Sequence, residues 1–143
     1  MARLFQEEGI SFRYPENWRL EREESENGWT VSLQSPDTAF LLVSCDNTMP
    51  TTEEVAEATL DALRSEYPGL EADPCVDSLA GQMAVGHDIN FFSFDLTNTC
   101  WTRSIYSEAG TVLVLWQAND LELEQYEPVM RAICSSLKVE EEE

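Results

Sequence analysis

A two-residue turn signal between two alternating segments constrains the fold of this chain more than any other feature. Asn27-Gly28 separates residues 18–25 from residues 29–35, and in both segments apolar side chains alternate with polar ones. Alternation places one face of each segment against a core, and Asn and Gly both tolerate the positive φ of a tight hairpin turn. The sequence therefore predicts an antiparallel hairpin with one buried face, which makes a sheet the framework of the fold.

Further extended segments are expected along the chain. Residues 39–45 and 111–117 are apolar on both faces, which predicts strands that are covered on both sides of the sheet. Residues 95–98 are predicted to turn a long strand back onto the next one. The remaining predicted strands are 4–6, 10–14, 71–79, 82–94 and 99–107.

Two segments have the spacing of amphipathic helices. Thr51 and Glu54 form a capping box, and apolar residues then recur at helical spacing from 56 to 67. A second helix is expected to end near Leu137, with Pro128 in its first turn, because a proline inside a helix removes a hydrogen bond. Two helices are therefore available to cover the sheet.

These elements predict one α+β domain over residues 1–139, followed by an acidic disordered tail at 140–143. Strands joined by tight turns indicate a central, mostly antiparallel twisted sheet flanked by helices. A chain of 143 residues with 43% hydrophobic residues is long enough to bury a substantial core. No internal repeat or linker interrupts it.

The formal net charge of −20 restricts the partners of such a domain. An acidic field repels phosphate backbones and anionic membrane surfaces, so nucleic-acid binding is not expected. The sequence contains no run of about 20 apolar residues, so membrane insertion is not expected. The charge suits a basic partner surface, and it equally suits a solvated acidic surface that serves solubility alone.

The cysteines and the N-terminus indicate a cytoplasmic protein. No Cys-x-x-Cys pair occurs, and the N-terminal residues contain no apolar segment typical of a signal peptide. We expect four reduced and mostly buried thiols, although an exported protein could form two disulfides. The four cysteines are Cys45, Cys75, Cys100 and Cys134.

The usual catalytic motifs are missing from the sequence, so we expect no enzyme, no cofactor and no metal. The alternative is an enzyme that uses Cys100 and His87, if the two side chains meet across a hairpin. His87 and Asp88 are adjacent in a strand, so they point to opposite faces and do not form an acid–base pair. Asp73 and Asp77 leave a weak cation site open.

Aromatic residues are the remaining candidates for partner binding. Phe91 and Phe92 lie on opposite faces of one strand, so one of them is exposed unless a helix covers it. Trp101 lies beside a polar segment and is the tryptophan expected to be partly exposed. An exposed aromatic surface on a sheet would bind an apolar segment of a partner. A purely structural role in the core is the alternative for all three.

The order of these signals resembles the PsbP-like superfamily, across residues 9–138. That superfamily contains the photosystem II extrinsic protein, a Ran-binding nuclear-import factor and many bacterial proteins of unknown role. The resemblance rests on Phe12-x-Tyr14-Pro15-x-x-Trp18, Leu79-x-Gly81-Gln82-x-Ala84 and Ser135-Ser136-Leu137.

The resemblance implies an α/β/α sandwich and binding rather than catalysis. It favours a non-catalytic protein-interaction module, a small, acidic and soluble bacterial scaffold or adaptor. A narrower alternative is a cytoplasmic adaptor-chaperone for a type VI secretion effector, as in one bacterial branch that holds apolar N-terminal helices. The expected partner is a protein that presents an apolar helix or a basic surface, and a homodimer is the alternative assembly.

Overall fold

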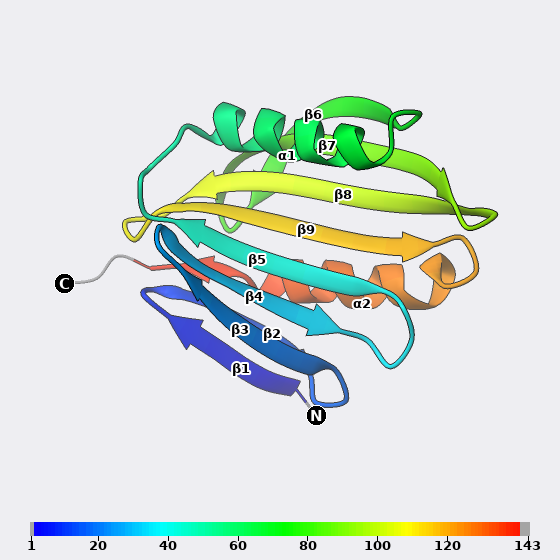
Figure 1. The fold of residues 1–143 in the computed structure, drawn as a ribbon. Helices are drawn as coiled ribbons and strands as arrows, with labels where there is room; N and C mark the ends of the chain where they lie inside the picture. Colours follow the sequence, from blue (N-terminus) through cyan, green and yellow to red (C-terminus); the bar gives the residue numbers. More distant parts are fainter. Residues whose placement is uncertain (1, 141–143) are drawn as a thin grey trace.

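A seven-stranded antiparallel sheet forms the framework of the molecule. The structure is a computed structural model that describes residues 2–140, and Figure 1 shows its arrangement. The strand order is β3-β4-β5-β9-β8-β7-β6, and every neighbouring pair is antiparallel. The strands are β3 (Arg19–Ser25), β4 (Gly28–Gln34), β5 (Phe40–Asp46), β6 (Glu71–Leu79), β7 (Gln82–Ser93), β8 (Leu96–Tyr106) and β9 (Thr111–Asn119).

A second, three-stranded sheet joins the two ends of the described chain. It consists of β1 (Ala2–Glu7), β2 (Ile10–Pro15) and β10 (Lys138–Val139), in the order β1-β2-β10. The first two strands were predicted, whereas β10 was not, because two residues carry no periodic signal. β10 is held by antiparallel pairing with β2, where Lys138 faces Ser11.

The first helix forms as its capping signal predicts. In α1 (Thr52–Glu66) the Thr51 hydroxyl accepts a hydrogen bond from the Glu54 backbone N–H at 3.0 Å. This bond satisfies one of the free amides of the first turn. Tyr67 directly follows the helix as its C-cap, and its aromatic ring stacks on Phe91 of the sheet.

The second helix begins earlier than its proline indicates. α2 runs over Leu123–Ser136, so Pro128 lies inside the helix and the prediction that it occupies the first turn was wrong. The helix begins early because the backbone amides of Gln125 and Tyr126 both donate to the Glu122 carbonyl. Tyr126, Met130 and Ile133 are buried and anchor the helix on both sides of the proline.

The two helices pack on opposite faces of the seven-stranded sheet. Leu60 of α1 belongs to the same apolar cluster as Leu115 of β9, whereas Met130 of α2 belongs to the cluster that contains Val114 and Trp116. Because successive strand residues point to opposite faces, these neighbours in β9 contact different helices. The small sheet adds its buried residues to the α2 side. The α+β class and the mostly antiparallel sheet are confirmed.

Two hairpin turns differ by one or more residues from their predicted positions. The β3–β4 turn consists of residues 26 and 27, and Gly28 already pairs with Ser25. Gly28 has φ +146°, and a Cβ there would lie 1.8 Å from the Cys45 carbonyl oxygen. The glycine is therefore required by the neighbouring strand as well as by the turn. The β7–β8 turn consists of Phe94 and Asp95 rather than residues 95–98.

The C-terminal segment lies beside the small sheet. The Glu140 backbone N–H donates to the Gly9 carbonyl at 2.8 Å. Of the acidic tail predicted at 140–143, residues 141–143 lie outside the described residues. No helix among the described residues is long and apolar enough to cross a membrane.

Candidate functional site

Phe91 and Phe92 lie on opposite faces of β7, and only one of them is exposed. Phe91 is buried under α1, where its ring stacks on Tyr67 with centroids 3.9 Å apart. Phe92 points to the other face and is 69% exposed. The structure therefore separates these two predicted binding residues, one into the core and one onto the surface.

Phe92 belongs to a group of exposed apolar side chains that we call the apolar end, consisting of Phe92, Phe94 and Leu121. Phe94 is 96% exposed and Leu121 is 79% exposed. The backbone N–H of Asp120 donates to the carbonyl of Thr97, which is the strand partner of Phe92, so the loop carrying Leu121 lies against the β7–β8 hairpin. Figure 1 shows the β7–β8 turn, the start of α2 and the end of α1 at the same end of the sheet.

Phe94 is an unusual residue type for its position in a two-residue hairpin turn. Phe94 and Asp95 have φ values of +53° and +62°. This is the left-handed region, which bulky side chains rarely adopt and which costs roughly 1–2 kcal/mol per residue. The ring also borders a hollow of about 280 Å³ that Tyr67 and Phe91 line. A strained backbone here presents a phenyl ring to solvent.

Acidic side chains flank the apolar end. Asp95 follows Phe94 in the turn, Asp120 precedes Leu121, and Glu124 lies in the first turn of α2; all three are exposed. An apolar surface beside several carboxylates matches a partner that carries apolar and basic side chains together.

Sequence analysis missed Phe94 and Leu121. The sequence places Phe94 in a strand, whereas the structure pairs Ser93 with Leu96 and puts Phe94 in the two-residue turn between them. Leu121 lies in an acidic loop with no periodicity that could identify it. Its exposure depends on which neighbours the tertiary fold brings to that loop.

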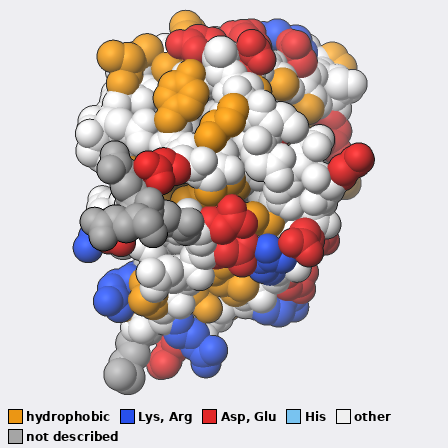
Figure 2. Space-filling model, turned by 90° about the vertical axis from the view of Figure 1, so that its left-hand side faces the viewer, with side chains coloured by type: hydrophobic (Ala, Val, Ile, Leu, Met, Phe, Trp, Pro, Cys, Tyr) orange, Lys and Arg blue, Asp and Glu red, His pale blue; other side chains and the backbone are white. Residues whose placement is uncertain are grey.

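The opposite end of the sheet carries a second exposed apolar area. Met49, Met83 and Tyr106 are 48%, 70% and 47% exposed. Figure 2 views this end and shows apolar side chains gathered over its upper part, with acidic groups among them. The Tyr106 hydroxyl lies 3.4 Å from the Thr52 backbone nitrogen, and the Tyr106 backbone is hydrogen-bonded to Gln82. Tyr106 therefore has local structural contacts in this area.

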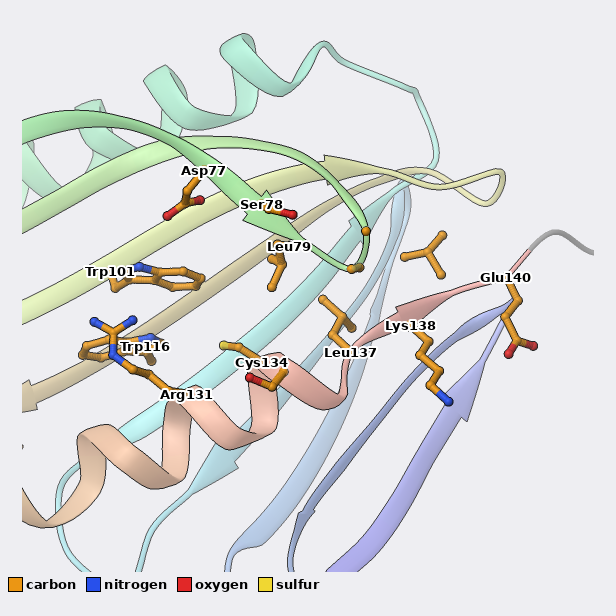
Figure 3. A pocket seen from close by; sticks show the side chains of 14 residues that line it. Asp77, Ser78, Leu79, Trp101, Trp116, Arg131, Cys134, Leu137, Lys138 and Glu140 are labelled. Atoms are coloured by element: carbon orange, nitrogen blue, oxygen red, sulfur yellow. The ribbon is translucent and has the colours of Figure 1, made fainter.

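Trp101 is only 8% exposed, but it lines a cleft. The cleft has a volume of about 600 Å³ and lies between α2 and the β6–β7 hairpin (Figure 3). Trp101 stacks on Trp116 with centroids 5.9 Å apart, and both rings are flanked by arginines. The guanidinium carbon Cζ of Arg103 lies 4.5 Å from the Trp101 ring centroid, and Cζ of Arg131 lies 5.6 Å from the Trp116 ring centroid.

Arg103 fixes the upper wall of this cleft. It is 2% exposed, and it donates from Nε to Asp77 of β6 at 2.9 Å and from Nη2 to Asp88 of β7 at 3.0 Å. Burial alone lowers the pKa of Arg103, but the two carboxylates raise it above its usual value, so the guanidinium stays charged. Three adjacent strands are thus tied together at the edge of the sheet.

His87 and Cys100 point to the same face of the sheet, yet they do not form an accessible catalytic pair. Cys100 is fully buried, and burial raises the pKa of its thiol to about 12. His87 is 6% exposed; its Nε2 lies 3.7 Å from Glu57 Oε1, and its Nδ1 has no partner among the described residues. Asp88 binds Arg103 on the other face, as the alternation predicted.

The acidic groups do not converge on a cation. Within residues 2–140, no group of three or more His, Cys, Asp or Glu side chains is arranged to hold a metal ion. Asp77 is hydrogen-bonded to Arg103, and Glu122 accepts hydrogen bonds from the backbone of Thr38 and Ala39. These two carboxylates therefore stabilise the fold through hydrogen bonds to neighbouring elements.

Solved structures share this fold at low sequence identity. Cyanobacterial PsbP from Synechocystis aligns with a TM-score of 0.65 and 12% identity, covering 97% of this chain and 92% of that one. A protein of unknown function from Pseudomonas aeruginosa aligns with a TM-score of 0.59 and 15% identity, covering 99% of both chains. LpqN of Mycobacterium tuberculosis, which is involved in cell envelope biogenesis, aligns with a TM-score of 0.54 and 16% identity, covering 92% and 83%.

These alignments show that the chain has a PsbP-like fold and that uncharacterised bacterial proteins share it. No family model matches the sequence, and no curated protein matches it.

Proposed function

We propose, from this PsbP-like fold, that the chain is a non-catalytic protein-interaction module, an acidic scaffold or adaptor that acts in the cytoplasm. In this proposal the two helices and the sheet between them form an α/β/α sandwich. Its binding surface is the apolar end rather than a covered face. The partner is a protein segment, such as an amphipathic helix, with an apolar side and basic flanks.

The observation that carries the proposal is the exposed ring of Phe94 in a left-handed turn. A two-residue hairpin turn of this kind requires positive φ at both positions, where Asn, Asp and Gly are the usual residues, so an exposed phenylalanine is present there against the local backbone preference. Aromatic residues also dominate the energetics of protein interfaces when a partner desolvates them. Phe92 and Leu121 are also exposed at this end of the sheet, so the proposal gives a partner three anchoring positions.

Charge supports a basic partner over an acidic one. The chain has 28 acidic and 8 basic residues, and the carboxylates at positions 95, 120 and 124 flank the apolar end. Complementary charge accelerates association and disfavours partners of the same sign. The same repulsion acts against a homodimer through this surface. A basic partner is therefore favoured over a second copy of this chain.

The buried state of Cys100 supports a non-catalytic role. A nucleophilic thiol must reach its substrate and must ionise near neutral pH, and Cys100 has neither property. The enzyme that uses Cys100 and His87 is therefore the weaker alternative. The adaptor-chaperone for a type VI secretion effector is a narrower form of the present proposal, in which the partner is an apolar effector helix.

Binding of designed helical peptides tests the proposal. An amphipathic peptide with Leu on one side and Lys at its flanks should bind, and the same peptide with Glu at its flanks should not. F92S together with F94S should weaken binding at least about tenfold, because the anchoring rings are lost. Met83→Ser, which removes an equally exposed apolar side chain at the opposite end, is the matched control.

Equal binding by the F92S/F94S variant and the M83S variant would overturn the proposal. Sedimentation over a range of protein and salt concentrations tests the alternative that a second copy of this chain, rather than a basic partner, occupies the apolar end. If a dimer forms at high salt and is lost in the F92S/F94S variant, the occupant of the apolar end is a second copy of this chain rather than a basic partner.

A further inference from the structure

The cleft between α2 and the β6–β7 hairpin has the composition of a ligand site independent of the apolar end. We propose that it binds a carboxylate carried on an apolar body, either a free carboxylic acid or the C-terminal residue of a peptide. Its volume of about 600 Å³ lies within the range of small-molecule sites.

One side of the cleft is apolar, whereas the rest of its lining includes polar side chains such as Ser78 and Ser135. Leu79 from the β6–β7 hairpin faces Cys134 and Leu137 from the end of α2, and Trp101 lies to one side of them, beside Trp116 (Figure 3). Burial raises the pKa of the Cys134 thiol to about 12, so this wall carries no charge. This apolar side of the cleft therefore matches the apolar body of a ligand.

Two hydrogen-bond donors lack acceptors where Trp101, Trp116 and Arg131 meet. The indole Nε1 of Trp116 is buried and has no hydrogen-bond partner among the described residues. Arg131 uses Nε for Glu127 at 2.8 Å, and its two terminal nitrogens have no hydrogen-bond partner within residues 2–140. The Arg131 side chain is 55% exposed, so water can solvate its terminal nitrogens. A buried donor without an acceptor costs roughly 1–3 kcal/mol, and this cost applies to the Trp116 indole, where a ligand that supplies an acceptor would recover it.

A carboxylate suits this donor set better than a neutral carbonyl or a phosphate. Its two oxygens match the planar fork of Arg131, and one of them can also accept from the indole. A phosphate carries more charge than a single arginine offsets, and Asp77 and Glu140 in the lining would repel it more strongly than a carboxylate of single charge. Asp77 itself is already bound to Arg103 and leaves Arg131 available.

Lys138 does not contribute to the donor set, although it belongs to the lining. Figure 3 shows its side chain directed away from Trp116 and Arg131, toward the small sheet. The proposal therefore depends on one guanidinium and one indole, and it can be tested at those two groups.

Titration of the isotope-labelled full chain with hydrocinnamate, followed by NMR, tests the proposal. We expect a saturable downfield shift of the Trp116 indole N–H, and a much smaller effect from hydrocinnamamide, which lacks the charge. Arg131→Gln should weaken binding at least about tenfold. Arg64→Gln, which alters an exposed arginine on α1, should leave the titration unchanged, and the spectrum itself reports whether each variant is folded.

A peptide ending in Leu-Phe with a free C-terminus, compared with its C-terminal amide, identifies the source of the carboxylate. A saturable shift with the acid, the peptide or both supports the proposal and identifies where the bound carboxylate comes from. Equal shifts from acid and amide, equal titration of R131Q and R64Q, or no saturable shift with any probe would overturn it. The F92S/F94S variant should titrate normally, so failure of this site and failure of the apolar end are distinguishable.

Discussion

Gly28 shows how one backbone position can serve two structural requirements. The residue follows the β3–β4 turn, and its φ of +146° is unfavourable for any side chain. A methyl group at this position would also collide with the carbonyl of Cys45 on the adjacent strand, so the two strands could not keep their present separation.

Gly28→Ala should therefore lower the free energy of unfolding by more than about 3 kcal/mol, because both the φ angle and the strand pairing oppose a Cβ. Urea denaturation followed by tryptophan fluorescence measures the change. Gly69→Ala is the control, since a Cβ there meets nothing within 4 Å and should alter stability by less than about 1 kcal/mol. Similar values for the two variants would contradict the argument.

The four thiols differ in exposure, and this difference predicts their reactivity. Cys45, Cys100 and Cys134 are buried, whereas Cys75 is partly exposed, and all four are free. Burial raises the pKa of Cys45 to about 11 and that of Cys100 and Cys134 to about 12. The thiolate is the reactive form, so these three should react slowly in the folded protein.

Reaction with Ellman's reagent should thus reveal one fast thiol in the native protein and four in denaturant. Cys75→Ser should abolish the fast phase. A fast phase that survives in C75S and disappears in C100S would contradict the assignment, and it would also strengthen the enzyme alternative that uses Cys100.

At the scale of elements, Glu122 joins the start of α2 to the loop before β5. Burial raises the pKa of its carboxyl, but hydrogen bonds from Thr38, Ala39 and Asn119 outweigh burial and lower the pKa below its usual value of 4.5. A lowered pKa in the folded state stabilises the fold above the unfolded-state pKa, and this contribution is lost as the pH falls through the folded value.

Glu122→Gln should accordingly destabilise the protein at pH 7 by about 1–2 kcal/mol, because a neutral amide accepts these bonds less strongly. The difference between the two proteins should shrink as the pH falls below 4.5. Urea denaturation across this pH range measures both effects. A difference that stays constant from neutral to acid pH would show that the charge of Glu122 does not contribute.

Pro128 lies inside α2, where a residue with an N–H would complete the helical hydrogen bonds. Pro128→Ala should raise the free energy of unfolding by about 1–3 kcal/mol, since the alanine restores the missing donor and its side chain is small. The control is Gln125→Ala on the same helix, which should change stability by less than about 0.5 kcal/mol. A loss of stability in P128A would indicate that the proline ring makes a contact worth more than the hydrogen bond.

At the scale of the whole molecule, charge is the dominant property. A net charge of −20 on 143 residues destabilises the compact state through self-repulsion. Salt screens this repulsion over roughly 10 Å at 0.1 M.

The melting temperature should therefore rise by several degrees as NaCl increases from about 10 mM to 0.3 M, because screening relieves repulsion that is larger in the folded state. Thermal denaturation followed by circular dichroism measures the rise. KCl should have the same effect at equal ionic strength. A rise that depends on which cation is used would indicate specific ion binding instead.

Local signals account for most of the fold but for little of the candidate site. Alternation placed the strands, and the Thr51 cap placed the start of α1. The shifted β7–β8 turn was missed because Phe94 reads as a strand residue, and its left-handed φ is imposed by the pairing of Ser93 with Leu96. The predicted set of Phe91, Phe92 and Trp101 is divided between a helix-covered face, an exposed end and a cleft wall.

The sequence by itself determined the α+β class, the antiparallel sheet and the strongly acidic surface, because periodicity, turn residues and charge act over short distances along the chain. Only the tertiary structure decided which side chains remain exposed and which donors remain without acceptors. Phe94, Leu121, Trp116 and Arg131 illustrate this. Exposure and hydrogen bonding depend on neighbours from distant strands and helices, and no local pattern encodes that arrangement.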